Sequence, residues 1–136
     1  MKGLHIIADL YGCRNREMLA SSAKLRETCV AACKDVGLTV LGDHFYQFDG
    51  LSENQIGGAT GAVVFAESHL AVHTWPESDG ATLDVYVCNV TCDNSDKAEK
   101  LYAMLMQSLA PEEVMVERVG RGRGLPLKKK HLAAVR

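Results

Sequence analysis

Three strand-like runs follow one another between residues 59 and 90, and they constrain the fold more than any other part of the sequence. Residues 59–66 are apolar throughout, as in a strand that is covered on both faces. Residues 70–75 and 81–90 follow as two further strands, with a turn at residues 77–80 between them. Pairing of these two runs as a hairpin predicts a sheet that is mainly antiparallel.

Side chains alternate along the last two of these runs, which assigns each residue to one face of the sheet. One face carries Leu70 and Val72 on the first strand and Leu83, Val85 and Val87 on the second. The opposite face carries Ala71, His73 and Trp75 on the first strand and Asp84, Tyr86 and Cys88 on the second. We expect helices to cover the leucine and valine side, and we expect His73 and Cys88 to share the other side.

The remaining segments supply the other strands and two helices. Strands are predicted at residues 4–10, 38–48 and 114–119, a loop at residues 49–58, and helices at residues 15–36 and 95–110. This order predicts an α/β chain of the α+β type, a two-layer sandwich with two helices on one face of a mainly antiparallel sheet. Polar and aromatic side chains are left on the other sheet face, and a second copy of the chain, in a homodimer, is the simplest cover for it.

Composition narrows the class of protein. The 136 residues suit one domain, predicted at residues 1–120 and followed by a basic tail at residues 121–136. A net charge of -2 gives no general attraction to nucleic acid. No apolar run approaches the ~20 residues of a membrane span, and the start lacks the apolar segment of a signal peptide, so we expect a cytoplasmic protein. Its five cysteines are an odd number, expected as free thiols, with Cys29 and Cys33 in the core.

Residues 67–77 gather a serine, two histidines, a tryptophan and two carboxylates within eleven positions. One interpretation is a metal site made by His69 and His73, which are four residues apart, together with Cys88 and Cys92, which have the same spacing. The residues between the two histidines favour a strand, where four residues span roughly 13 Å. Two histidines that far apart cannot hold one ion, which disfavours a metal site.

A second interpretation is a hydrolase that uses Ser68, His73 and Asp84. The nucleophile elbow of such enzymes needs glycines two positions before and after the serine, whereas Ala66 and Leu70 occupy these positions here. The plainest alternative gives neither residue a function, with Ser68 in a turn and His73 as an ordinary histidine of the sheet.

The group as a whole resembles a known family. Glu67-Ser68-His69-Leu70, followed by residues 73–77 with the sequence His-Thr-Trp-Pro-Glu, is similar to the processing site of the bacterial S-adenosylmethionine decarboxylases of the short, pyruvoyl-dependent class. The resemblance extends over most of the chain: residues 3–13, the region of Phe48, Thr60-Gly61, and residues 84–88.

This resemblance implies a proenzyme that cuts itself between Glu67 and Ser68, giving a β chain of residues 1–67 and an α chain of residues 68–136. The Ser68 hydroxyl attacks the Glu67 carbonyl, elimination releases the upstream chain, and a pyruvoyl group remains at the new amino terminus. This cofactor forms a Schiff base with S-adenosylmethionine and accepts the electrons left by carbon dioxide. The product is the aminopropyl donor for spermidine synthesis.

The resemblance also implies roles for other residues. His73 takes a proton during processing, Thr60 provides a hydroxyl where the family usually has a serine, and Cys88 returns a proton to the substrate carbon. Phe48 stacks on adenine, Glu77 binds the ribose hydroxyls, and Leu70 lines the same pocket. No metal is implied.

The spacing of Ser68 and His73 creates a geometric requirement. Five residues separate them, so alternation puts them on opposite faces of a strand, and a bend near His69 is needed to bring them together. Two other functions stay open: a pyruvoyl-dependent decarboxylase of a basic amino acid such as ornithine or arginine, and an unprocessed homologue that acts as a binding or regulatory partner.

Overall fold

The computed structural model describes residues 2–122. The elements in chain order are β1 (Gly3–Tyr11), α1 (Arg16–Ala20), α2 (Ser22–Asp35), β2 (Thr39–Gln47), β3 (Ala59–Ala66), β4 (Ser68–Trp75), the short 3-10 helix η1 (Pro76–Ser78), β5 (Gly80–Cys88), α3 (Ser95–Leu109) and β6 (Glu113–Arg121). Most of the predicted basic tail lies outside the described residues. The domain boundaries given above stay predictions.

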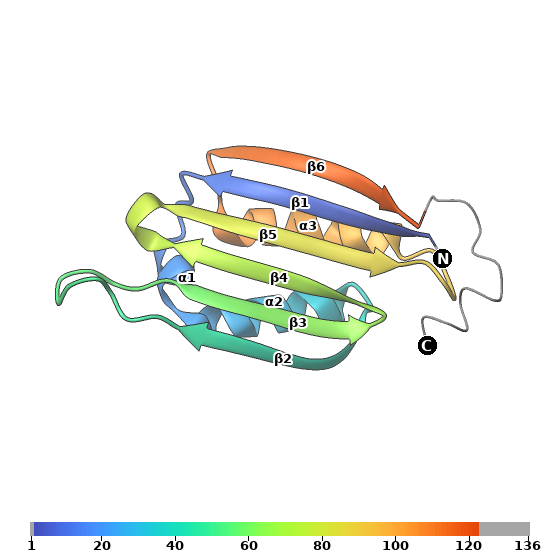
Figure 1. Cartoon of the computed structure of the whole chain (residues 1–136), viewed down its shortest axis with the longest axis horizontal. Helices are drawn as coiled ribbons and strands as arrows, with labels where there is room; N and C mark the ends of the chain where they lie inside the picture. Colours follow the sequence, from blue (N-terminus) through green and yellow to red (C-terminus); the bar gives the residue numbers. More distant parts are fainter. Residues whose placement is uncertain (1, 123–136) are drawn as a thin grey trace, which may run out of the picture.

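The six described strands form one sheet with the order β2-β3-β4-β5-β1-β6. Every neighbouring pair is antiparallel. All three helices lie on the same face of the sheet (Figure 1). The predicted two-layer α+β architecture is therefore confirmed. None of the helices in residues 2–122 is long and apolar enough to cross a membrane.

The core lies between the sheet and the helices. Leu70 and Val72 of β4 are fully buried there, as are Leu83 and Val85 of β5. These residues share a cluster with side chains of α2 and α3, including Cys29, Cys33, Leu101 and Leu105. The leucine and valine side of the two strands is thus the helix-covered side, and the two cysteines are core residues, as the sequence predicts.

The helix predicted at residues 15–36 is wrong in one respect, because the structure has two helices there. Ser21 lies between α1 and α2 in an extended conformation, and its side chain accepts a hydrogen bond from the backbone N–H of Lys24. A serine in this position satisfies a free N–H at the start of the second helix, and it can do so only by leaving the first.

The sheet face without helices, called the open face below, carries many large apolar side chains. Ile7, Val64 and Trp75 are 38%, 49% and 44% exposed on it. A tight hairpin joins β3 and β4 at one end of the sheet. Phe65 pairs directly with Ser68, so Ala66 and Glu67 alone form its tip.

Candidate active site

Ser68 begins β4 beside the hairpin tip. Its side chain is on the same side of the strand as Leu70 and Val72, and the residue is only 9% exposed. The Ser68 Oγ accepts a hydrogen bond of 2.7 Å from the backbone N–H of Cys88, at the end of β5. This serine is therefore held in place by the neighbouring strand, and its own hydroxyl proton is not used in that bond.

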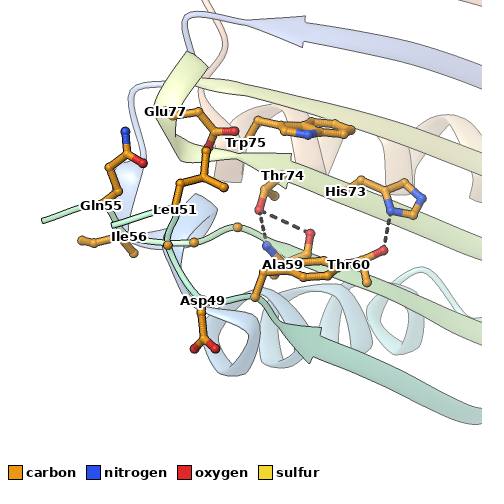
Figure 2. Close-up of a pocket in the computed structure, with 14 residues that line it drawn as sticks. Asp49, Leu51, Gln55, Ile56, Ala59, Thr60, His73, Thr74, Trp75 and Glu77 are labelled. Atoms are coloured by element: carbon orange, nitrogen blue, oxygen red, sulfur yellow. Dashed lines mark hydrogen bonds between the residues drawn. The ribbon is translucent and has the colours of Figure 1, made fainter. Parts of the chain in front are cut away.

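His73 lies toward the other end of β4, on the open face. Thr60 of β3 is its direct partner in the antiparallel register, and the Thr60 hydroxyl is hydrogen-bonded to His73 Nδ1. Figure 2 shows the two side chains pointing toward each other from neighbouring strands. Backbone pairing thus fixes a hydroxyl beside an imidazole, which is an arrangement suited to proton transfer.

A cavity of about 430 Å³ opens next to this pair. Its walls come from the end of β4, the start of β3, the loop at residues 49–58, and the side chains of Phe48 and Glu77. Small-molecule sites in proteins have volumes of about 300–1,000 Å³ and mostly apolar walls with a few polar groups. The cavity fits this description, with Glu77 as a carboxylate on its wall.

Thr74 fastens this region to the rest of the fold. It is 5% exposed, and its hydroxyl donates a 2.6 Å hydrogen bond to the Leu19 carbonyl of α1. The same oxygen accepts a 2.9 Å bond from the backbone N–H of Ala59 at the start of β3. One side chain thus links β4, β3 and α1 immediately beside the cavity. Figure 2 shows its bonds to Ala59.

The structure brings together Phe48, Thr60, His73 and Glu77, but not the other residues identified from the sequence. The bend expected near His69 is wrong, because β4 pairs with β5 without interruption from His69 to Trp75. Ser68 and His73 therefore face opposite sides and lie roughly 16 Å apart along the strand.

Three further residues lie away from the cavity. Cys88 is on the open face with His73, as predicted, but it is six residues along β5 from Thr82, the partner of His73, a separation of roughly 20 Å. Leu70 is fully buried in the core, so its side chain does not line the cavity. Glu67 forms the hairpin tip, next to Ser68.

The hydrolase interpretation is excluded by this geometry. Ser68 and His73 are on opposite faces, and the Asp84 carboxylate is hydrogen-bonded to His5 Nε2 at 3.0 Å. Within residues 2–122, no three His, Cys, Asp or Glu side chains are grouped so that they could hold a metal ion.

A cluster of polar and aromatic side chains lies on the open face at the Ser68 end. His5 contacts Asp84, the ring of Tyr86 lies near the rings of His5 and His69, and the Arg121 guanidinium lies 4.7 Å from the centre of the Tyr86 ring. Burial, and next the nearby His5, lower the pKa of His69. Sequence alternation places Asp84 and Tyr86 of this cluster on one face, but the contacts depend on strand order, which the sequence alone did not predict.

Comparison with known proteins identifies the family. The family model described as S-adenosylmethionine decarboxylase matches residues 4–122. The chain belongs to this family. It is 39% identical over 120 residues to an S-adenosylmethionine decarboxylase proenzyme of Hydrogenobaculum sp. (strain Y04AAS1), covering 88% of this chain and 81% of that protein. It is 40% identical over 112 residues to the proenzyme of Aquifex aeolicus (strain VF5), covering 82% and 75% of the two chains.

A solved structure agrees with this family membership. The crystal structure of the adenosylmethionine decarboxylase from Aquifex aeolicus VF5 matches the fold with a TM-score of 0.72 and 35% identity, covering 93% of this chain and 94% of that one. Three apolar residues also line the cavity of this chain, although the sequence did not indicate them as site residues: Leu51, Ile56 and Trp75. Of these, only Trp75 carried a signal, since alternation puts it on the face of His73.

Proposed function

We propose that this chain cleaves itself between Glu67 and Ser68 and then, as a pyruvoyl-dependent enzyme, decarboxylates S-adenosylmethionine to the aminopropyl donor of spermidine synthesis. The observation that carries this proposal is the position of the Glu67–Ser68 peptide in a chain of this family. The peptide lies at a two-residue hairpin tip, with the serine hydroxyl buried and held by the Cys88 N–H. We expect the enzyme to act in the cytoplasm.

The cleavage needs only groups of the protein and water. The Ser68 Oγ forms a bond to the Glu67 carbonyl carbon as the C–N bond breaks, which turns the amide into an ester. Removal of the Ser68 α-proton then breaks the Cβ–Oγ bond of residue 68 and releases the upstream chain, which ends in the α-carboxylate of Glu67. Addition of water to the remaining dehydroalanine, with loss of ammonia, leaves the pyruvoyl group at residue 68.

The residues around Ser68 fit this group. When present, the pyruvoyl ketone supplies an electron sink for decarboxylation. Cleavage makes residue 68 a chain terminus, so its orientation is no longer set by the hairpin. The backbone N–H of Cys88 donates to the Ser68 oxygen, so residue 88 adjoins residue 68 on the neighbouring strand. The Cys88 thiol, on the open face, is the group that returns a proton to the substrate carbon.

One chain alone cannot assemble the site, since His73 and Ser68 lie roughly 16 Å apart on opposite faces. A homodimer that packs two open faces together removes the separation along the strand. A two-fold axis that lies between the sheets and crosses the strands places the His73 end of one copy over the Ser68 end of the other. The exposed apolar side chains of the open face, including Ile7, Val64 and Trp75, support burial of this face.

In this arrangement, His73 and Thr60 of one copy move protons for the Ser68 of the other. The cavity beside them receives the nucleoside part of the substrate. Phe48, half exposed at the cavity wall, offers a ring for stacking on adenine, and Glu77 offers a carboxylate that accepts hydrogen bonds from the ribose hydroxyls. Leu70, on the helix-covered side of β4, packs in the core and does not line the cavity.

The two alternative functions are not favoured. The family model that matches this chain is that of S-adenosylmethionine decarboxylase, which does not favour a basic amino acid as the substrate. An unprocessed binding protein has no need for a buried serine hydroxyl at the hairpin tip, and the relatives that match this chain are named as decarboxylase proenzymes.

Intact mass of the purified protein tests the cleavage. We expect two chains that meet between Glu67 and Ser68, and one full-length chain for Ser68→Ala. Ser52→Ala, in the exposed loop, is the matched control and should cleave like the parent. Cys88→Ala should cleave but release carbon dioxide slowly. A parent protein that stays as one chain, or a cleaved Ser68→Ala variant, would refute the assignment.

Co-expression of two variants tests the shared site. Ser68→Ala and His73→Ala should each remain uncleaved alone. A mixed dimer contains one site with both residues intact, so a random mixture should cleave about a quarter as many chains as the parent protein. Mixed dimers that form, as tagged subunits would reveal, but stay uncleaved would exclude a site shared between copies.

A further inference from the structure

The loop at residues 49–58 does more than connect β2 to β3. We propose that Leu51 and Ile56 of this loop form an apolar wall that closes on the nucleobase of the substrate and selects nucleoside substrates over plain amino acids. This inference rests on the proposed function, since it concerns the substrate of the same site. It assigns a role to a loop that the family motifs do not include.

The loop exposes apolar side chains in an unusual way. Leu51 is 91% exposed and Ile56 is 67% exposed, yet both line the cavity, along with Phe48 and Trp75. The residues between them, Ser-Glu-Asn-Gln, are polar. Large apolar groups that stay in water on an otherwise polar loop indicate a surface that is covered during function.

The base of the loop is firmly anchored. The side-chain amide of Gln47 donates to the carbonyls of Gly57 and Gly58, both at 3.1 Å, and the Phe48 N–H donates to the Gly58 carbonyl at 2.9 Å. A Cβ added at Gly58 would lie 2.1 Å from the Thr74 carbonyl oxygen, so the backbone is pressed against β4 there. The loop therefore stays at the cavity mouth.

Within the loop, the Gln55 N–H donates to the Ser52 carbonyl at 3.0 Å, which turns the chain back on itself. This turn lies between Leu51 and Ile56 in the sequence, so it brings the chain back from one to the other. Both can lie against a ligand in the cavity without movement of the anchored base.

The chemistry of the cavity identifies the part of the ligand that the wall contacts. Phe48 and Trp75 offer aromatic faces, and Glu77 accepts hydrogen bonds, which suits a flat base joined to a sugar. Leu51 and Ile56 add apolar surface but no charge, so they favour a base over the charged end of an amino acid. Burial of each side chain by the ligand is worth roughly a tenfold gain in affinity.

The single tryptophan of the chain, Trp75, provides the measurement. Adenosine is titrated into the purified dimer and Trp75 fluorescence is followed. We expect the adenosine Kd to rise roughly tenfold for Leu51→Ala and for Ile56→Ala. Leu41→Ala is the control, because Leu41 is 67% exposed on β2 but does not line the cavity. It should leave the Kd unchanged. In the decarboxylation assay, the loop variants should raise KM and leave kcat close to that of the parent.

Two results would overturn the inference. One is an adenosine Kd that is unchanged in both loop variants, and the other is a change in dimer dissociation, rather than in adenosine binding, caused by the same substitutions. Methionine gives a further arm, and equal weakening of methionine and adenosine binding would also contradict selection of the base. Failure of the proposed function looks different. A chain that binds adenosine through the loop but neither cleaves nor decarboxylates would refute the enzyme while leaving the wall intact.

Discussion

Replacement of Thr74 by valine should destabilise the fold because the hydroxyl group is lost while the packing is kept. Valine has nearly the shape of threonine, so packing in this buried position is kept, while the hydrogen bonds of the hydroxyl to Ala59 and Leu19 are lost. The Ala59 N–H is left without its acceptor, and Ala59 is 1% exposed, so water does not replace it. A buried donor without a partner costs about 1–3 kcal/mol, and the lost bond to Leu19 adds about 1 kcal/mol.

We therefore expect Thr74→Val to lower the free energy of unfolding by about 2–4 kcal/mol. Urea unfolding of the uncleaved Ser68→Ala protein measures this change, and a midpoint lower by about 1–2 M corresponds to it. Thr74→Ser is the control. It keeps the hydroxyl and removes one methyl group, at a cost of about 1 kcal/mol. If serine costs more than valine, packing and not hydrogen bonding holds this site together, and the reasoning fails.

Two other predictions follow from burial and charge. Cys92 is the exposed cysteine, whereas burial raises the pKa of Cys29 and Cys33 to about 12. One thiol should therefore react quickly with a disulfide reagent in the native protein, and all five should react after unfolding. A fast phase that survives Cys92→Ser would contradict this. The pKa of His69 lies below its ordinary 6.5, so the unfolded chain binds this proton more readily. The free energy of unfolding should therefore fall as pH drops from about 7 to 5, and this dependence should be weaker in His69→Gln. Urea unfolding at several pH values measures it, and an equal slope in the parent and the variant would contradict the prediction.

The sheet was largely predictable because local patterns determine it. Alternation along residues 70–75 and 81–90 correctly assigned the core side, and it placed His73 and Cys88 together on the open face. Short turns made the antiparallel pairing the natural choice. The break at Ser21 was less accessible, since the apolar period continues through it and only the capping of α2 interrupts the helix.

The sequence predicted which residues belong to the site better than it predicted their arrangement in space. Motif spacing brought Thr60, His73 and Glu77 into consideration, and the structure places them around one cavity. The bend near His69 was assumed so that a single chain could hold both Ser68 and His73. β4 is a central strand with partners on both sides, and this pairing keeps it regular. The loop at residues 49–58 could not be placed, because its conformation depends on Gln47 and on contacts with β4.

The strand order has a consequence for the cleaved protein. A cut between Glu67 and Ser68 leaves β1, β2 and β3 in one piece and β4, β5 and β6 in the other, yet β1 lies between β5 and β6 in the sheet. The two pieces are interleaved, so neither can leave without breaking strand pairs on both sides of β1. The proenzyme folds as one chain, but the cleaved protein unfolds into two separate chains. Once unfolded, the pieces must meet again to refold, and the apparent stability of the mature enzyme then depends on its concentration.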